Sequence, residues 1–284
     1  MNEFPILAKE RLAENIYSYV FRAENIASHA RAGQFVILRV DEKGERFPLT
    51  LCDWSANEGW IRLVFQVVGR STWKLSQLGE GEAILDLVGP LGKPTPVERC
   101  GHVVCVGGGV GIAAIYPICR EMKRGGNRVT AILGARTADL LILEEEMKEV
   151  ADELLFSTDD GSRGMRGRVT WALEEFLKRE GADLVIAIGP AVMMKFASAV
   201  TKELGIPTRV SLNSIMLDGT GMCGTCRVEV GGETRFACVD GPEFDGHQVD
   251  WNLLLARLSQ YLEEEEVSRR LSAGQEARHS SPQG

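Results

Sequence analysis

Three cysteines and an aspartate lie in one glycine-rich stretch of the chain: Asp218, Cys223, Cys226 and, further on, Cys238. Four residues separate Asp218 from Cys223, and two separate Cys223 from Cys226. This is the plant-type C-x4-C-x2-C spacing of a [2Fe–2S] site, with an aspartate at the first position. Glycines between the ligands permit sharp turns and let backbone N–H groups point at sulfur. The pattern predicts a [2Fe–2S] cluster held by three thiolates and one carboxylate.

Two other interpretations of these thiols stay open. Cys223 and Cys226 also form the first half of a zinc site, for which His247 is a candidate fourth ligand. A second C-x2-C pair or a pair of histidines would favour zinc, and the sequence contains neither. The remaining alternative is a set of thiols that bind no metal.

A second candidate site is a glycine loop between an apolar strand and a helical pattern. Its residues are Gly107, Gly108, Gly109 and Gly111. Backbone N–H groups at a helix N-terminus suit a pyrophosphate, although the G-x-G-x-G spacing differs from the usual G-x-G-x-x-G. The strand that follows ends at Arg136 and not at an acidic residue that would bind a ribose. The loop indicates a nucleotide site, and a simple tight turn is the alternative.

Two more strand ends carry turn residues of the same kind. Asp159 and Gly161 follow the third strand of this region, and Gly189 and Pro190 follow the fourth. Each alone reads as an ordinary strand-to-helix turn. Ligands of open α/β sheets bind at the carboxyl ends of the strands, so three such turns on one edge favour a ligand site.

The elements that would position these residues fall into two kinds. Residues 1–97 show short apolar runs separated by Gly- or Asx-rich breaks, which predict an antiparallel β-barrel. Residues 98–212 alternate short strands with helices, which predicts a parallel sheet covered on both faces. Pro90, Pro94 and Pro96 mark the expected linker between them. The expected helices of the second part are 112–122, 140–151, 169–177 and 191–204.

The rest of the chain divides into three segments. Residues 213–248 are the expected cluster-binding segment, with little periodic structure. Residues 249–271 carry an apolar stripe and predict one amphipathic helix. Residues 272–284 are polar and predict a disordered tail.

Composition excludes several classes of protein. The 284 residues suit about two domains. Lys+Arg 32 against Asp+Glu 40 gives a net charge of −8, which argues against a nucleic-acid partner. No apolar run approaches the ~20 residues that cross a bilayer, and the first residues do not read as a secretion signal. We therefore expect no membrane partner and a cytoplasmic location.

The order of barrel, nucleotide domain and C-terminal cluster resembles the ferredoxin–NADP reductase superfamily, in its branch with an appended iron–sulfur cluster. That branch includes the electron-transfer subunit of dihydroorotate dehydrogenase. Within this branch, the chain resembles more closely the small (alpha) subunits of NADH-dependent reduced ferredoxin:NADP oxidoreductases, which bifurcate electrons. Asp218 in the cluster motif and the stretch 236–244 carry this closer likeness.

The resemblance implies a flavin site on the barrel. Thr50 is expected near the reactive N5 edge of the flavin, as the catalytic position. The other implied flavin contacts are Pro48, Leu49, Val64, Phe65, Gln66, Ser71 and Thr72. The superfamily pattern has an arginine where this chain has Phe47, and Arg46 comes one residue early, so Arg70 is the other candidate for the phosphate charge.

The resemblance also implies a function. The expected protein is an NAD(P)H-linked oxidoreductase subunit with FAD, a [2Fe–2S] cluster and NAD(H). NADP(H) is the alternative that Arg136 would tolerate. The implied partner is a larger subunit with flavin and [4Fe–4S] clusters, which would serve ferredoxin. Alternatives are the electron-transfer subunit of dihydroorotate dehydrogenase, or of a sulfide dehydrogenase or hydrogenase. A zinc-containing nucleotide-binding redox sensor is the remote alternative.

Overall fold

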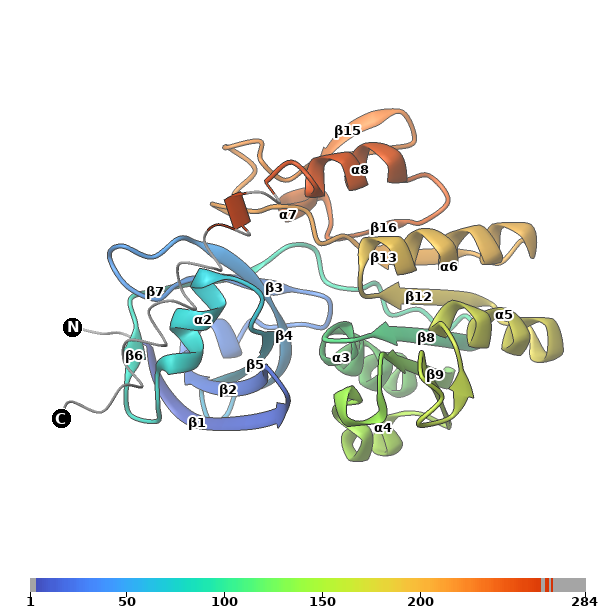
Figure 1. Ribbon diagram of the computed structural model, residues 1–284, viewed down its shortest axis with the longest axis horizontal. Helices are drawn as coiled ribbons and strands as arrows, with labels where there is room; N and C mark the ends of the chain where they lie inside the picture. Colours follow the sequence, from blue (N-terminus) through green and yellow to red (C-terminus); the bar gives the residue numbers. More distant parts are fainter. Residues whose placement is uncertain (1–3, 262–263, 266, 268–284) are drawn as a thin grey trace.

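The computed structural model describes residues 4–261, 264–265 and 267. The N-terminal part is an antiparallel sheet of seven strands in the order β6-β1-β2-β5-β4-β3-β7. Its strands are β1 (Phe4–Ala13), β2 (Ile16–Arg22), β3 (Phe35–Arg39), β4 (Phe47–Ser55), β5 (Trp60–Gln66), β6 (Ala83–Ile84) and β7 (Asp86–Leu91). The edge strands β6 and β7 are consecutive in the chain, so the sheet curls into a nearly closed barrel (Figure 1). Two helices accompany it, α1 (Glu24–Ala27) and α2 (Arg70–Gln77).

Aliphatic and aromatic side chains together fill the barrel. Tyr19 and Phe21 of β2 are fully buried. The Tyr19 and Phe65 rings pack edge to face, with their centres 5.2 Å apart. Aromatic and β-branched residues suit a strand with one buried face, so the sequence signal for the barrel was strong. One expectation was wrong: Pro90 lies inside β7 and not in the linker, because β7 is an edge strand and an edge strand tolerates proline.

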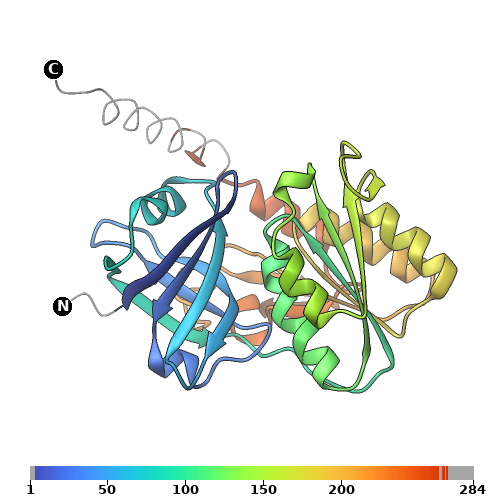
Figure 2. The same cartoon turned by 90° about the horizontal axis from the view of Figure 1, so that it is seen from below.

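The second part is a mixed sheet in the order β11-β10-β9-β8-β12-β13-β16. Its parallel strands are β8 (His102–Gly108), β9 (Arg128–Ala135), β10 (Glu153–Thr158), β11 (Met165–Arg166), β12 (Leu184–Ile188) and β13 (Thr208–Ser211). The helices are α3 (Gly111–Arg124), α4 (Glu144–Val150), α5 (Val169–Glu180) and α6 (Ala191–Glu203), with the short 3-10 turn η1 (Ala138–Leu140). Helices α3 and α4 pack on one face, and α5 and α6 on the other (Figure 2). The central strands are mostly apolar, as sheets buried on both faces require.

The helix expected over 140–151 begins only at Glu144. Leu143 precedes it with a φ of +57°, a left-handed conformation that no helix continues through. The apolar spacing begins before Leu143, and it gives no sign that the backbone leaves the helical conformation there.

The C-terminal segment is more ordered than its sequence suggested. It contains β14 (Arg227–Val230), β15 (Glu233–Phe236), α7 (Ala237–Asp240), β16 (Glu243–Asp245) and α8 (Trp251–Leu258). Strands β14 and β15 form a hairpin, and β16 pairs antiparallel with β13 at the edge of the second sheet. Of the helix expected over 249–271, the structure describes α8, and most residues after Tyr261 lie outside the described part, as does the tail 272–284.

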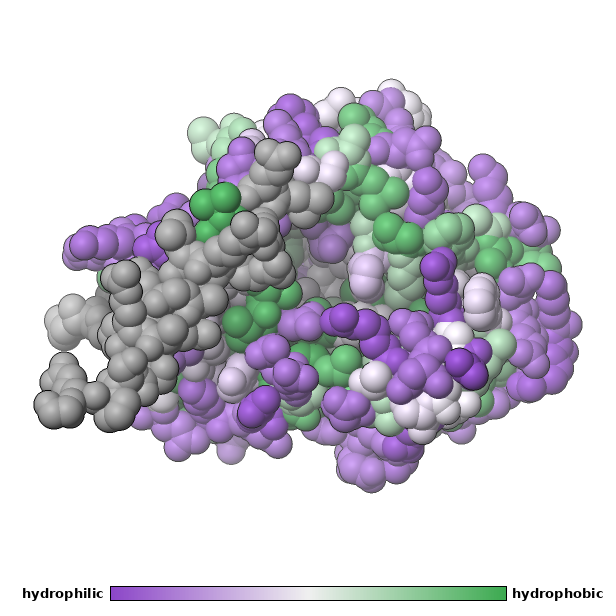
Figure 3. Space-filling model, viewed as in Figure 1, coloured by the Kyte–Doolittle hydropathy of each residue, from purple (hydrophilic) through white to green (hydrophobic). Residues whose placement is uncertain are grey.

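The barrel and the second sheet lie side by side, and the C-terminal segment lies across one end of both (Figure 1). On the face drawn in Figure 3, apolar side chains gather around a hollow near the middle of the molecule, inside a largely hydrophilic rim. Within the described ranges, no helix has both the length and the apolar character needed to cross a bilayer.

Candidate functional site

The predicted cluster ligands lie on the loop before β14 and on α7. Cys226 and Cys238 are buried, and their sulfur atoms are 3.2 Å apart. Cys223 is exposed, and its backbone N–H donates to Asp218 Oδ2 at 3.0 Å. The sulfurs of Cys226 and Cys238 are thus in direct contact, while Asp218 and Cys223 are linked by a hydrogen bond from backbone to side chain. Among the described residues, no three metal-binding side chains converge on one point.

The donor chemistry of this loop fits an iron–sulfur cluster. Burial and the neighbouring Cys226 raise the pKa of the Cys238 thiol to about 12. A thiol with a raised pKa loses its proton when it binds a metal ion, because the thiolate is the form that coordinates the metal. Soft thiolates favour iron–sulfur clusters and zinc over hard cations. These residues could therefore hold the cluster, with Asp218 as the single oxygen donor.

The loop reaches the barrel through Gly219. This residue has a φ of +75°, and a Cβ on it would lie 2.5 Å from Leu91 Cδ1 and 2.9 Å from Ile37 Cδ1. Leu91 belongs to β7 and Ile37 to β3, so only a glycine lets the loop pack this closely on the barrel. The candidate ligands consequently lie next to the domain expected to bind the flavin.

His247 is engaged elsewhere. Its Nε2 lies 2.9 Å from the hydroxyl of Thr201 on α6. The imidazole therefore hydrogen-bonds to the second sheet's helix layer and is not directed to the cysteines, which removes the zinc ligand considered from sequence.

The predicted flavin contacts lie on two neighbouring strands. Pro48, Leu49 and Thr50 are on β4, half-buried and paired with β3, where Thr50 lies opposite Phe35. On β5, Phe65 packs inside the barrel against Tyr19, so any flavin contact from it would come from the backbone. Val64 packs toward the nucleotide domain, and Gln66 lines the pocket described below.

The start of α2 offers backbone donors for a phosphate. Thr72 Oγ1 accepts hydrogen bonds from the backbone N–H groups of Val68 and Gly69, at 3.0 and 3.2 Å, and Ser71 Oγ donates to Glu45. Both predicted hydroxyls are thus used within the protein. What remains for an anion are the unpaired N–H groups of the first turn.

The two candidate arginines differ in their surroundings. Arg46 pairs with Asp86 at 3.5 Å, and Asp86 also binds Arg39 at 2.7 Å. Arg70 is exposed at the start of α2 and has no ion-pair partner within the described part of the chain. Arg70 is therefore better placed to offer its charge to a phosphate.

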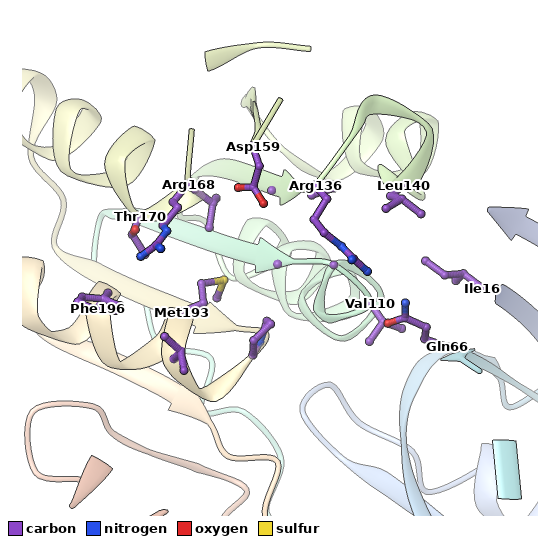
Figure 4. Close-up of a pocket in the computed structure, with 17 residues that line it drawn as sticks. Ile16, Gln66, Val110, Arg136, Leu140, Asp159, Arg168, Thr170, Met193 and Phe196 are labelled. Atoms are coloured by element: carbon purple, nitrogen blue, oxygen red, sulfur yellow. The ribbon is translucent and has the colours of Figure 1, made fainter. Parts of the chain in front are cut away.

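A pocket of about 400 Å³ lies at the carboxyl ends of β8, β9, β10 and β12. The predicted residues that line it are Gln66, Gly108, Gly109, Arg136, Asp159 and Pro190. Arg136 extends from the end of β9 toward Val110 and Gln66, and the Asp159 carboxylate points into the pocket (Figure 4). Gly107 at the end of β8, Gly111 at the start of α3, and Gly161 and Gly189 after β10 and β12 lie nearby and are not among the lining residues. A Cβ on Gly111 would collide with the carbonyl oxygen of Ile188, so this glycine lets α3 begin against β12.

Sequence reasoning missed part of the lining. Ile16, Val110, Leu140, Arg168, Thr170, Met193 and Phe196 also line the pocket. Arg168 and Thr170 flank the start of α5, directly after Gly167, so Gly164 and Gly167 were the available signal. Phe196 and Met193 follow from the packing of α6 beside α5, which a linear pattern does not show.

Comparison with known proteins identifies two regions. Residues 213–250 match the family described as the iron–sulfur cluster binding domain of dihydroorotate dehydrogenase B. Residues 105–199 match the oxidoreductase NAD-binding domain. These ranges contain the four candidate cluster ligands and the glycine loop, respectively.

Full-length similarity is equally clear. The chain is 51% identical over 263 residues to a dihydroorotate dehydrogenase B (NAD(+)) electron transfer subunit homolog of Thermotoga maritima, covering 93% of each. It is 32% identical to the electron transfer subunit from Desulforamulus reducens, covering 87% of this chain and 97% of that one. A chain of the solved NADH-dependent reduced ferredoxin-NADP oxidoreductase is 50% identical, with a TM-score of 0.90. The match covers 95% of this chain and 97% of that one.

These similarities confirm the expected superfamily, the barrel-plus-sheet fold and the oxidoreductase class, with NAD, FAD and an iron–sulfur cluster as cofactors. This chain therefore belongs to the family of dihydroorotate dehydrogenase B electron-transfer subunits and their homologues.

Proposed function

We propose that this chain exchanges hydride with NAD(H) and passes single electrons to or from a larger flavin/[4Fe–4S] subunit, as in the bifurcating NADH-dependent ferredoxin:NADP oxidoreductase. When bound, FAD supplies the conversion between the hydride of a nicotinamide and the single electrons that a [2Fe–2S] cluster accepts. The chain's own residues bind and orient the carriers, and no side chain is required as an acid or base.

The observation that carries this proposal is the placement of the cluster loop. Cys226 and Cys238 are paired at 3.2 Å, and the loop packs on β3 and β7 of the barrel through Gly219. The nucleotide pocket includes Gln66 at the end of β5 of the same barrel. A flavin held by β4 and β5 would thus lie between the nucleotide and the cluster ligands.

We propose the predicted flavin and nucleotide contacts for these carriers, with the backbone N–H groups at the start of α2 in place of the Ser71 and Thr72 hydroxyls, which bond within the protein. We propose Asp218, Cys223, Cys226 and Cys238 as cluster ligands, and Thr50 as the residue beside the reactive edge of the flavin. We also propose the division into a flavin barrel (1–97), a nucleotide domain (98–212) and a cluster segment (213–248), with the qualification that β16 of the last segment is a strand of the nucleotide sheet.

As an electron-transfer subunit, the chain serves a larger partner subunit. Three apolar side chains are exposed around the candidate ligands: Leu217 at 46%, Met222 at 89% and Val239 at 38%. Exposed apolar groups beside a redox centre favour a protein partner there, because such patches are uncommon on surfaces that face only water. We propose that the larger subunit contacts this apolar patch and that ferredoxin is served through it.

The similarity to dihydroorotate dehydrogenase B subunits supports a second candidate, transfer of electrons from dihydroorotate to NAD. The identity of the co-purified subunit decides between the two. A TIM-barrel flavoprotein supports the dihydroorotate function, whereas a glutamate-synthase-like subunit with several iron–sulfur clusters supports the bifurcating function.

The test is anaerobic purification followed by iron, sulfide and flavin analysis and by visible and EPR spectra. We expect iron and acid-labile sulfide in equal amounts, FAD, and reduction of both centres by NADH. Separate reduction with NADPH tests the nucleotide preference. Zinc in place of iron, or a protein without flavin absorbance, would contradict the proposal.

A further inference from the structure

The barrel and the nucleotide domain are joined by a contact between β4 and α3. Arg120 of α3 donates from Nη1 to Oδ1 of Asp53 on β4 at 2.6 Å. The two side chains are only 16% and 22% exposed, so water screens this ion pair less than a surface pair.

Aromatic rings hold the ion pair in place. The Arg120 guanidinium lies 5.1 Å from the centre of the Trp54 ring on the barrel and 5.5 Å from that of Tyr116 on its own helix. The backbone N–H of Trp54 donates to Asp53 Oδ1 at 2.9 Å, which fixes the orientation of the carboxylate. Cys52, next to Asp53, is fully buried in the apolar cluster that includes α3. Residues of both domains therefore fix the geometry of the Asp53–Arg120 ion pair.

The same helix carries the nucleotide loop. α3 begins at Gly111, directly after the Gly108–Val110 lining of the pocket, and Arg120 lies about 13 Å further along at ~1.5 Å per residue. The opposite side of the pocket belongs to the barrel, through Ile16 and Gln66. A shift of α3 against β4 would thus change the distance between the two sides of the pocket.

We infer that the Asp53–Arg120 pair is a positioning clamp that sets the approach of the nicotinamide to the flavin. The inference rests on the proposed function, in which NADH gives a hydride to FAD and leaves as NAD⁺. Hydride donor and acceptor must lie ~3–3.5 Å apart, and a misplacement of about 1 Å costs on the order of 100-fold in rate. The clamp touches neither reactant and acts through α3 and the glycine loop.

The experiment is stopped-flow reduction of the purified holoprotein by NADH under anaerobic conditions. It measures the limiting rate of flavin reduction, the NADH concentration at half-maximal rate, and the long-wavelength charge-transfer absorbance of the nicotinamide–flavin pair. The variants are Arg120→Met, which keeps the packing stem, Arg120→Lys, Asp53→Asn and the double variant Asp53→Asn/Arg120→Met. The matched control is Lys123→Gln, which removes an ion pair of 2.7 Å between α3 and Asp152 inside the nucleotide domain.

We expect Arg120→Met to lower the limiting rate by about 10- to 100-fold and to weaken the charge-transfer band. The NADH concentration at half-maximal rate should change little, because all lining residues of the pocket except Ile16 and Gln66 belong to the nucleotide domain. Asp53→Asn and the double variant should show a similar loss, since the pair acts as a unit. Arg120→Lys should restore part of the rate, and Lys123→Gln should match the wild type.

Each other outcome is decisive. An unchanged limiting rate in a folded Arg120→Met protein would overturn the clamp and leave the proposed function standing. The same holds for additive losses in the double variant, or for a loss as large in Lys123→Gln. If Arg120→Met does not fold, Asp53→Asn, which keeps its shape, decides by the same measurements. A wild-type flavin that NADH does not reduce would overturn the proposed function and the clamp together.

Discussion

At the scale of single residues, the charge offered to the flavin phosphates depends on which arginine is free. Arg46 is bound to Asp86, whereas Arg70 stands exposed at the start of α2. We expect Arg70→Gln to weaken FAD binding by roughly tenfold or more, the usual effect of losing one charge-assisted hydrogen bond. Fluorescence titration of the deflavinated protein with FAD measures this. Arg46→Gln is the matched control, and equal losses in both variants would contradict the assignment.

A second residue-scale prediction concerns Glu243 of β16. Thr95 donates its hydroxyl to Glu243 Oε1, while the buried Oε2 has no partner among the described residues. Burial raises the pKa of this carboxyl above its ordinary value, more than Thr95 and Arg209 lower it. The unfolded chain therefore releases this proton at lower pH than the folded protein, and the contribution of Glu243 to stability falls as the pH rises through the raised pKa.

Glu243→Gln keeps an acceptor for Thr95 and cannot ionise. Thermal unfolding at pH 5 and pH 8 should therefore show the variant gaining melting temperature relative to the wild type as the pH rises. Glu42→Gln, at an exposed position, should show no such trend. A difference in melting temperature that is constant with pH would argue against a buried, protonated Glu243.

Residue-level prediction from sequence is easiest where chemistry imposes a spacing. The spacing of Asp218, Cys223 and Cys226 predicts the candidate ligands, with Cys238 further along the chain, and the structure places the sulfurs of Cys226 and Cys238 3.2 Å apart. Prediction from sequence failed where a site is assembled by tertiary packing: Phe196 of α6 reaches the nucleotide pocket, and nothing in its local sequence marks it. The Asp53–Arg120 contact is of the same kind, since 67 residues separate its partners.

At the scale of elements, the cluster loop depends on one close approach to the barrel. Gly219→Ala places a methyl group 2.5 Å from Leu91 and costs about 1–2 kcal/mol in left-handed backbone strain. We expect a lower melting temperature and slower electron transfer from flavin to cluster, which rapid-mixing reduction with NADH resolves.

Gly232→Ala separates the two causes. Gly232 has a similar φ of +77°, but a Cβ on it would meet nothing within 4 Å. The Gly232→Ala variant should therefore lose stability through backbone strain but keep the wild-type rate of electron transfer from flavin to cluster. Equal slowing in both variants would show that loop strain alone, and not the contact with the barrel, controls the transfer.

The elements themselves were largely readable. Alternation in residues 16–68 and the strand–helix rhythm from 103 onward predicted the confirmed barrel and sheet, because burial imposes those periods. The segment 213–247 gave no such signal, since short strands such as β16 are ordered by pairing with distant partners. The late start of α4 likewise follows from the backbone at Leu143 and not from its apolar spacing.

At the scale of the whole molecule, the apolar patch around the cluster ligands predicts how the subunits meet. Met222 is its most exposed member, at 89%. Met222→Glu should weaken association with the larger subunit by roughly tenfold or more, as charges placed in interface centres do, while iron and flavin content stay unchanged. Co-purification and titration of the two subunits measure this.

Leu7→Glu on β1 is the control, since Leu7 is also exposed, at 39%, but lies on the barrel and not in the cluster segment. If both charges weaken the complex equally, or if neither does, the larger subunit does not contact the patch.

The pairing of β16 with β13 has a consequence for engineering. Strand β16, which follows the candidate ligand Cys238, forms the edge of the nucleotide sheet beside β13. A protein cut after residue 212 would lose β16, and the edge of β13 would expose unpaired backbone groups that favour aggregation. The cluster segment (213–248) therefore cannot be removed without disturbing the nucleotide domain. A chimera that joins this segment to another flavin-binding barrel should therefore have its junction between β7 and β8. It should keep the nucleotide domain and the C-terminal segment together.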